Sequence, residues 1–192
     1  MKSDQILSIT PESPSYPLRV AILSDTHAYT DPRILAVVAH CDMALHAGDV
    51  CGAPVLEQLS RYAPELHVVA GNNDAATRWR QTGATTERLP DALKIRLPGG
   101  LIVVEHGHRF GNHPDHGDLR AAWPDARLIV YGHTHRQVID QSESPWVVNP
   151  GAAGRTRVGD GPSCLLLTLA DADRWEIGLS QFEIEPPLAR AV

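Results

Sequence analysis

Cysteine and long apolar runs are both scarce in this chain. The three cysteines, Cys41, Cys51 and Cys164, are odd in number and lack CxxC spacing. This pattern argues against a disulfide framework and against a thiolate zinc site, so we expect the cysteines to be packing residues. No apolar stretch approaches the roughly 18 residues of a membrane span, and the first residues do not resemble a signal peptide. We therefore expect a cytoplasmic protein without a membrane partner.

Blocks of basic residues are also missing. The formal net charge is -6, and no run of Lys or Arg occurs. A protein that tracks nucleic acid needs a basic surface, so an extended nucleic-acid interface is not expected. The sequence does not name an oligomeric state, and a homo-oligomer is compatible with it.

The composition is that of one globular domain. The chain has 192 residues, of which 43% are hydrophobic, and cores typically divide only beyond about 250 residues. Residues 1–17 contain Pro11, Pro14 and Pro17 among polar residues, so we expect an extended N-terminal tail there. Residues 18–192 form the expected single domain. We find neither an internal repeat nor a low-complexity segment.

Short apolar runs alternate with amphipathic segments in the first half of the chain, which predicts parallel strands joined by helices. After residue 90 the pattern changes to hairpins, which indicates a second sheet. The expected class is α/β, with two stacked mixed β-sheets flanked by helices. Strands are predicted at 18–24, 43–46, 66–70, 92–97, 101–105, 128–131, 136–140, 146–148, 163–169 and 174–180, and helices at 32–39, 54–62 and 114–123.

Five polar clusters each follow one of these apolar, strand-like runs. They are Asp25-Thr26-His27, Gly48-Asp49, Gly71-Asn72-Asn73-Asp74, His106-Gly107-His108 and Gly132-His133-Thr134-His135. Strand ends deliver such side chains into one crevice. Asp25 and His27 alternate by two, so their side chains point the same way and can share one ion, and the alternating imidazoles of His133 and His135 likewise face one way.

Each cluster also has a simpler interpretation. An Asp-x-His triplet alone is often a polar loop, and an Asn after Gly is commonly a turn residue. Three histidines that directly follow apolar strands would each need a buried partner for both ring nitrogens if they were structural. This coincidence favours metal ligation. Asp49 can place one oxygen on each of two ions, and Gly48 leaves room for close backbone approach.

Together the five motifs resemble those of the calcineurin-like metallophosphoesterases, D-x-H, GD, GN-x-D/E, a histidine and GHxH. The resemblance covers residues 18 to about 170, and the short length is similar to the small, YfcE-like phosphodiesterase branch. It implies two divalent ions held at strand ends. The first ion would be bound by Asp25, His27 and His135, the second by Asn72, His106 and His133, and Asp49 would bridge them. Manganese is favoured by the resemblance alone, while iron, nickel and zinc also suit these ligands.

The implied reaction is hydrolysis of a small or nucleotide-type phosphodiester by a hydroxide that bridges the two ions. Two ions, two carboxylates and the hydroxide leave a site charge of about +1, which suits a small phosphorylated substrate. Many relatives place a histidine acid where this chain has Asn73. His108 could replace it as the acid, or it could line the wall. Asp49, Asn72 and His108 are therefore the candidate catalytic residues, and Asp74 is expected to orient a ligand or a turn.

Two alternatives remain open at this point. The first is a phosphomonoesterase, a dinucleotide polyphosphatase or a protein phosphatase of the same superfamily. The second is a binding scaffold like the retromer subunit, which shares the fold of the small phosphodiesterase branch.

Overall fold

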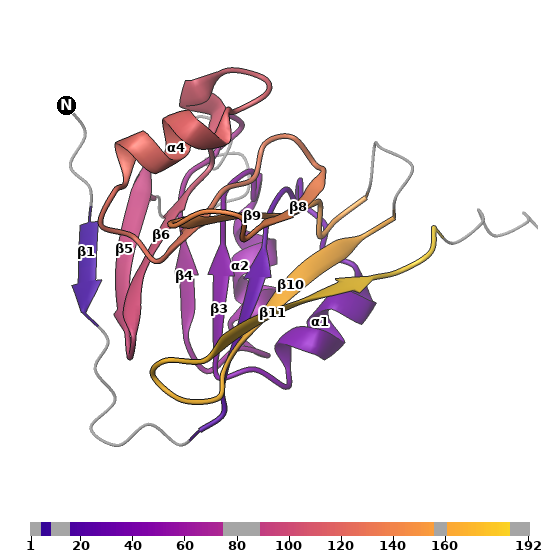
Figure 1. Ribbon diagram of the computed structural model, residues 1–192. Coiled ribbons are helices and arrows are strands. Elements are labelled where there is room, and N and C mark those ends of the chain that lie inside the picture. Colours follow the sequence, from indigo (N-terminus) through magenta and orange to yellow (C-terminus); the bar gives the residue numbers. More distant parts are fainter. Residues whose placement is uncertain (1–4, 9–15, 75–88, 156–160, 185–192) are drawn as a thin grey trace, which may run out of the picture.

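The computed structural model describes residues 5–8, 16–74, 89–155 and 161–184, and in them two β-sheets stack face to face (Figure 1). The described strands form a five-stranded and a six-stranded sheet. The five-stranded sheet has the order β11 (Trp175–Gln181), β10 (Ser163–Leu169), β2 (Leu18–Leu23), β3 (Met43–His46) and β4 (Leu66–Val68). The six-stranded sheet has the order β1 (Gln5–Ser8), β5 (Ala92–Leu97), β6 (Gly100–Glu105), β7 (Leu128–Val130), β9 (Trp146–Pro150) and β8 (Gln137–Asp140).

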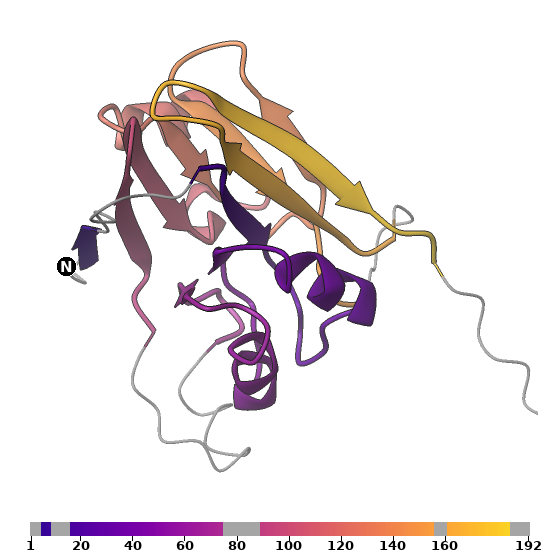
Figure 2. The same ribbon diagram turned by 90° about the horizontal axis from the view of Figure 1, so that it is seen from below.

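Successive side chains along a strand point to opposite faces of its sheet, and the buried ones form three hydrophobic layers. On β2, Val20 and Ile22 point between the sheets, whereas Ala21 and Leu23 point to the outer face. The helices α1 (Pro32–Val38) and α2 (Ala53–Leu59) cover that outer face (Figure 2). Helix α4 (His116–Ala122) covers the outer face of the other sheet through Leu119. The expected fold class, two stacked sheets flanked by helices, is confirmed.

The three predicted hairpins are present as antiparallel pairs, β5 with β6, β8 with β9 and β10 with β11. The helices are shorter than predicted, and α4 begins at His116 instead of residue 114. Asp31 caps α1 by accepting a hydrogen bond from the backbone N–H of Arg33, and Pro32 occupies the first turn as expected.

Two features of the sheets were not predicted. Gln5–Ser8, inside the expected tail, pairs in parallel with β5. The chain also leaves the six-stranded sheet after β9 and returns to the first sheet, where β10 lies antiparallel to β2. Both pairings join segments that are far apart in the sequence, so no local pattern encodes them.

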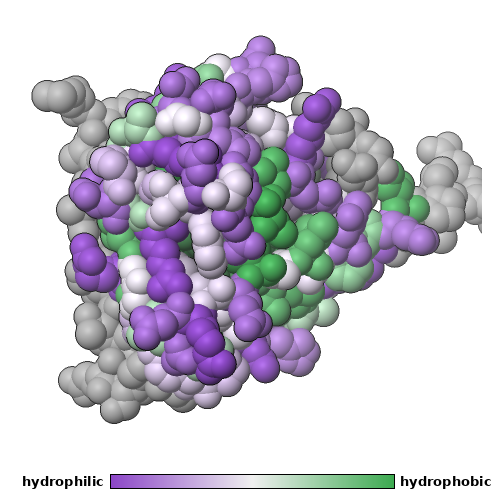
Figure 3. All heavy atoms as spheres, viewed as in Figure 1, coloured by the Kyte–Doolittle hydropathy of each residue, from purple (hydrophilic) through white to green (hydrophobic). Residues whose placement is uncertain are grey.

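The face seen in Figure 1 is largely hydrophilic, with one band of hydrophobic side chains (Figure 3). The exposed large hydrophobic side chains include Ile139 on β8 and Leu179 on β11, which are the edge strands of the two sheets. Within the described residues, no helix combines the length and hydrophobicity of a membrane-spanning segment.

Candidate metal centre

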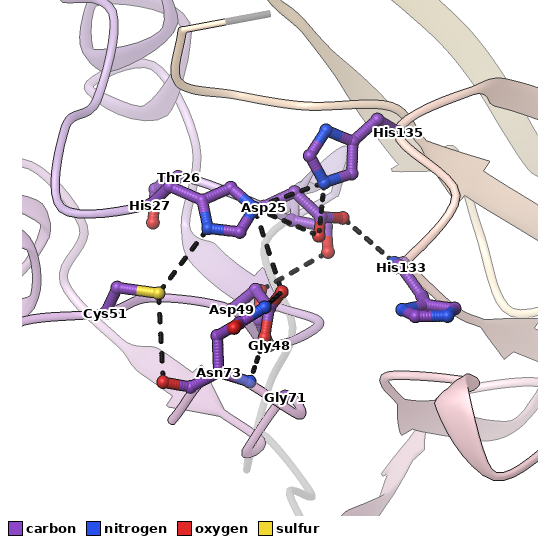
Figure 4. Close-up of polar contacts among 12 residues, drawn as sticks. Asp25, Thr26, His27, Gly48, Asp49, Cys51, Gly71, Asn73, His133 and His135 are labelled. Carbon is purple, nitrogen blue, oxygen red and sulfur yellow. Dashed lines mark hydrogen bonds and ion pairs between the residues drawn. The ribbon is translucent and has the colours of Figure 1, made fainter. Parts of the chain in front are cut away.

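The five polar clusters all follow strands that run parallel to a neighbour. β2, β3 and β4 are parallel in one sheet, and β6 and β7 are parallel in the other. Their carboxyl ends lie at the same end of the sandwich, and Figure 4 shows Asp25, His27, Asp49 and His135 directed toward one another there. This is the crevice in which ligands bind to open α/β sheets.

The backbone of these loops is unusual. All seven non-glycine residues with a positive φ among the described residues lie in three of the loops: Asp25, His27, Ala28, Asp49, Cys51, His133 and His135. The left-handed region costs a residue with a side chain about 1 to 3 kcal/mol. Such strain persists only where the surrounding structure enforces it, and here it places ligand-type side chains toward one point.

The first ligand group consists of Asp25, His27 and His135. The Nε2 atoms of the two histidines are 3.1 Å apart, and Asp25 Oδ1 lies 3.3 Å from His135 Nε2 and 3.9 Å from His27 Nε2. Within the described part of the chain, the buried Asp25 Oδ1 accepts no hydrogen bond. Its other oxygen, Oδ2, accepts one from the backbone N–H of His133, at 3.0 Å. A cation beside Oδ1 would satisfy this oxygen and both imidazoles.

The second ligand group consists of Asp25, Asp49 and His106. His106 Nδ1 lies 2.7 Å from the carbonyl oxygen of Ala47. A carbonyl only accepts, so Nδ1 donates and Nε2 keeps its lone pair. His106 Nε2 faces Asp49 Oδ1 at 3.5 Å and Asn72 Oδ1 at 3.2 Å.

Asp49 lies between the two groups. Its Oδ2 is 3.7 Å from His27 Nε2, whereas its Oδ1 is 3.5 Å from His106 Nε2. In the described residues, the ion-pair partners of the buried Asp25 and Asp49 are all histidines. Two buried carboxylates without a permanent positive partner are costly, and metal ions commonly compensate such charges. The donor set therefore fits two divalent cations.

Unlike the other predicted histidine ligands, His133 belongs to neither group. Its ring centroid lies 5.3 Å from that of His106 and 6.3 Å from that of His108. His108 itself is exposed, on the 3-10 turn His108–Phe110, with its ring centroid 5.5 Å from that of His106. These imidazoles form one side of the crevice, beside the second ligand group.

The pKa values in the site reflect the clustered charges. Burial alone would raise the pKa of Asp49, but His106 and the hydrogen bonds from Asn73 outweigh it and hold the pKa well below its usual range. Burial would lower the pKa of His106, yet Asp49 and Asp25 raise it above its usual value. Burial, and then His106, lower the pKa of His133. The carboxylates thus create a negative potential that attracts protons or cations to this crevice.

Asp74 and Asn73 hold the ligand loops in place through hydrogen bonds. Asp74 accepts hydrogen bonds from the backbone N–H groups of Val50, Cys51 and Gly71, at 3.1, 2.7 and 2.8 Å, and so ties the second loop to the third. This agrees with the prediction that Asp74 orients a turn. Asn73 donates its backbone N–H to Asp49 Oδ1 at 2.8 Å and its side-chain N–H to Asp49 Oδ2 at 2.6 Å. Asn73 is therefore turned toward the central carboxylate.

His46 has a structural role beside the site. It accepts a hydrogen bond from the backbone N–H of Gly48 on Nδ1, at 3.2 Å, and its Nε2 lies 3.1 Å from Thr26 Oγ1. Complete burial lowers its pKa to about 4, so the ring is neutral and bridges the first two loops. A Cβ on Gly48 would lie 2.8 Å from both Gly71 N and His106 Nδ1, which explains the glycine there.

Several other polar residues lie outside the ligand groups. Arg109 binds the buried Glu105 through two hydrogen bonds of 2.7 and 3.2 Å. His116 pairs with Asp140 at 2.6 Å, and His113 is exposed. Asn149 donates to the carbonyl oxygen of Gly132 at 2.7 Å and so supports the last loop.

Cys51 contacts the predicted ligand His27, and the sequence did not predict this contact. Its Sγ lies 3.5 Å from His27 Nδ1, and it is only half-buried, whereas Cys41 and Cys164 are buried. The spacing of the cysteines carries no signal for this contact. Only the adjacency of the first and second loops creates it.

Comparison with known proteins shows the family of this chain. Residues 18–172 match the calcineurin-like phosphoesterase superfamily domain. A probable metallophosphoesterase from Methanothermobacter thermautotrophicus is 29% identical over 157 residues, which span 78% of this chain and 85% of that protein. A phosphodiesterase from Methanocaldococcus jannaschii is 22% identical over 143 residues, which span 70% of this chain and 83% of that protein.

The fold is also that of a solved sorting protein. The structure of vacuolar protein sorting 29 from Cryptosporidium parvum is similar with a TM-score of 0.70 at 18% identity, covering 88% of this chain and 100% of that one. At this identity the likeness concerns the fold.

Proposed function

Because the chain belongs to the calcineurin-like phosphoesterase superfamily and is thus a metal-dependent phosphoric ester hydrolase, we propose that it is a phosphodiesterase acting on a small or nucleotide-type phosphodiester. The observation that supports the proposal most is the pair of ligand groups that share Asp25, with Asp49 between them. A histidine-lined site with two buried carboxylates suits metal-assisted attack on phosphorus.

In this proposal the first divalent ion is held by Asp25, His27 and His135 and the second by Asn72, His106 and His133, with Asp49 common to both. Asp25 and Asp49 remain ionised, while the imidazoles and the amide bind as neutral ligands. When bound, the ions supply Lewis acidity to the phosphoryl oxygens and lower the pKa of water enough to provide a hydroxide nucleophile at neutral pH. Manganese is the proposed ion, and zinc, iron and nickel are the alternatives that the same donors accept.

The protonation of the leaving group distinguishes this chain from many relatives. Asn73 donates to Asp49 and cannot act as an acid. His108 is exposed beside His106 and His133, so it is the proposed proton donor to the departing alkoxide. Loss of a positioned acid costs about 10²- to 10⁴-fold, and most for poor leaving groups. Because Asn73 supplies no proton and the replacement His108 is exposed, we expect activated and nucleotide-type esters to be cleaved faster than simple alkyl esters.

A hydrolysis panel tests the proposal. The metal-free protein is reconstituted with Mn²⁺ and offered an aryl phosphodiester, the matching aryl monoester, cyclic nucleotides and a dinucleotide polyphosphate. Diester cleavage that needs the metal and is faster than monoester cleavage supports a phosphodiesterase. Faster monoester or polyphosphate cleavage would assign the chain to another activity of the superfamily. The absence of two bound ions, together with no turnover of any ester under any divalent ion, would favour the scaffold alternative.

His108→Ala separates the proposed acid from the rest of the site. The variant should lose turnover of alkyl-leaving-group diesters more than of aryl diesters, because an aryl oxide leaves without a proton. If the variant cleaves each class of diester as fast as the wild type does, His108 has no role in the reaction.

A further inference from the structure

Cys51 occupies a position between two of the metal loops. Its Sγ lies 3.5 Å from His27 Nδ1 and 4.0 Å from the carbonyl oxygen of Asn73, and Figure 4 shows the sulfur between these two groups. The sequence predicted only a packing role for this cysteine. Its place in the site therefore calls for a different explanation.

The contact falls on the ring nitrogen of His27 that does not face the carboxylates. His27 Nε2 is the atom that lies near Asp25, Asp49 and His135. For Nε2 to offer a lone pair to a cation, the proton of the neutral ring must be on Nδ1, and Nδ1 then needs an acceptor. His106 satisfies the same requirement with the carbonyl oxygen of Ala47, at 2.7 Å.

A thiol can meet this requirement for His27. Sulfur is a weak acceptor through its lone pairs and a weak donor through S–H. The Asn73 carbonyl can only accept, so the S–H proton is directed to it, and the sulfur lone pairs are left for the Nδ1–H of His27. The donor and acceptor roles are then consistent: the Nδ1–H of His27 donates to the sulfur of Cys51, and the S–H of Cys51 donates to the Asn73 carbonyl oxygen.

The backbone holds the sulfur in this place. Cys51 has a φ of 61°, and its N–H donates to Asp74 Oδ1 at 2.7 Å. Asp74 also binds Gly71, so the same carboxylate that joins the second and third loops sets the position of Cys51. The orientation of His27 on the first loop thus depends on a residue of the second loop whose position is fixed by the third loop.

We propose that Cys51 is a positioning residue that orients His27 and selects its metal-binding tautomer. The inference rests on the proposed metal site. Partners of this kind usually contribute about 10- to 100-fold to metal affinity. Cys51→Ala should therefore weaken binding of one of the two ions by about that factor and leave the other ion nearly unaffected.

Calorimetric titration of the metal-free protein with Mn²⁺ measures this difference. Cys51→Ser keeps a short donor and acceptor group and should recover most of the lost affinity. Cys41→Ala is the matched control, because Cys41 is buried and its Sγ donates to the Val37 carbonyl, away from the site. This control should bind both ions as the wild type does.

A spectroscopic readout separates positioning from general stability. In the Co²⁺-substituted protein, the exchangeable Nδ1–H protons of ligating histidines give shifted proton NMR signals. One such signal should broaden by faster solvent exchange in Cys51→Ala and return in Cys51→Ser. If Cys51→Ala does not fold, the Cys51 thiol of the folded wild type is instead blocked by reversible thiomethylation. The modified protein should bind Mn²⁺ more weakly, and a reducing agent should restore the affinity for Mn²⁺.

The outcomes distinguish the two hypotheses. A wild-type protein that binds no divalent ion would overturn the proposed function. Two ions bound by the wild type, together with unchanged affinities and unchanged NMR signals in Cys51→Ala or in the thiomethylated protein, would overturn the role of Cys51 and leave the metal site intact.

Discussion

Removal of the Asp74 carboxylate should loosen the metal loops and destabilise the protein. Asp74 accepts three backbone N–H groups, from Val50, Cys51 and Gly71. A hydrogen bond to a charged group contributes about 1.5 to 3 kcal/mol, and half-burial places these bonds toward the lower value. Water can replace part of the loss, so we expect Asp74→Ala to lower the free energy of unfolding by about 2 to 4 kcal/mol.

The Asp74→Asn variant refines this expectation. Oδ2 accepts from both Val50 and Gly71, whereas Oδ1 accepts from Cys51. A carboxamide can keep the first two bonds through its oxygen, but its NH₂ group would face the N–H of Cys51. The free energy of unfolding should fall by about 1 to 2 kcal/mol, which is less than in the alanine variant.

Urea unfolding of the metal-free protein, followed by tryptophan fluorescence, measures both changes. Asp171→Ala is the matched control, since Asp171 also accepts two backbone N–H groups, from Asp173 and Arg174, but in an exposed turn. This control should unfold close to the wild type. The reasoning is refuted if Asp74→Ala is no less stable than Asp171→Ala, because the three hydrogen bonds would then contribute nothing.

Three further predictions concern the same region. Gly132→Ala should destabilise the protein and lower metal affinity, because a Cβ there would overlap Ser24 Oγ and come within 2.9 Å of Asp25 Oδ2; wild-type stability in denaturant would contradict this. The pKa of His46 is lowered to about 4 in the fold against 6.5 for the free side chain, so the unfolded chain binds more protons between these values. Stability of the metal-free protein should thus decrease as the pH falls from about 6.5 to 4, by an amount on the order of 3 kcal/mol, and His46→Gln should lose much of this slope in pH-dependent urea melts. Chelation should lower the melting temperature, since ligand at about 100 times Kd contributes about 2.7 kcal/mol per site; identical melting curves with Mn²⁺ and with chelator would argue against tight binding to the folded state.

Much of the fold could be predicted because strand signals in this chain are local. Met43–His46 was predicted with the bounds that the structure shows, and it is a buried apolar run with polar loops on both sides. The hairpin of Ala92–Leu97 with Gly100–Glu105 followed from a Pro-Gly-Gly turn. Helix ends were less accurate, because α1, α2 and α4 are all short and their last turns depend on packing against the sheets.

The site was predictable for a related reason. Ligand residues that directly follow apolar strands must lie at strand ends, and parallel strands bring those ends together. In the structure, ligand atoms of Asp25, Asp49 and His106 lie within 4.8 Å of one another, although these residues are far apart in the sequence. The sequence did not predict that the His133 ring lies outside the two tight groups, because ring direction follows from the local backbone and from neighbours on other loops.

The sequence by itself determined the chemistry of this protein: the residue types, their order along the chain and their position after strands. These are properties of local segments, and apolar alternation suffices to specify them. Only the tertiary structure decided which charged and polar side chains come into contact. The position of Asp49 between two histidines, the orientation of Asn73 toward Asp49 and the contact of Cys51 with His27 all depend on how separate loops meet. Such contacts are set by the packing of the sheets and by backbone strain in the loops, which no single segment of the sequence encodes.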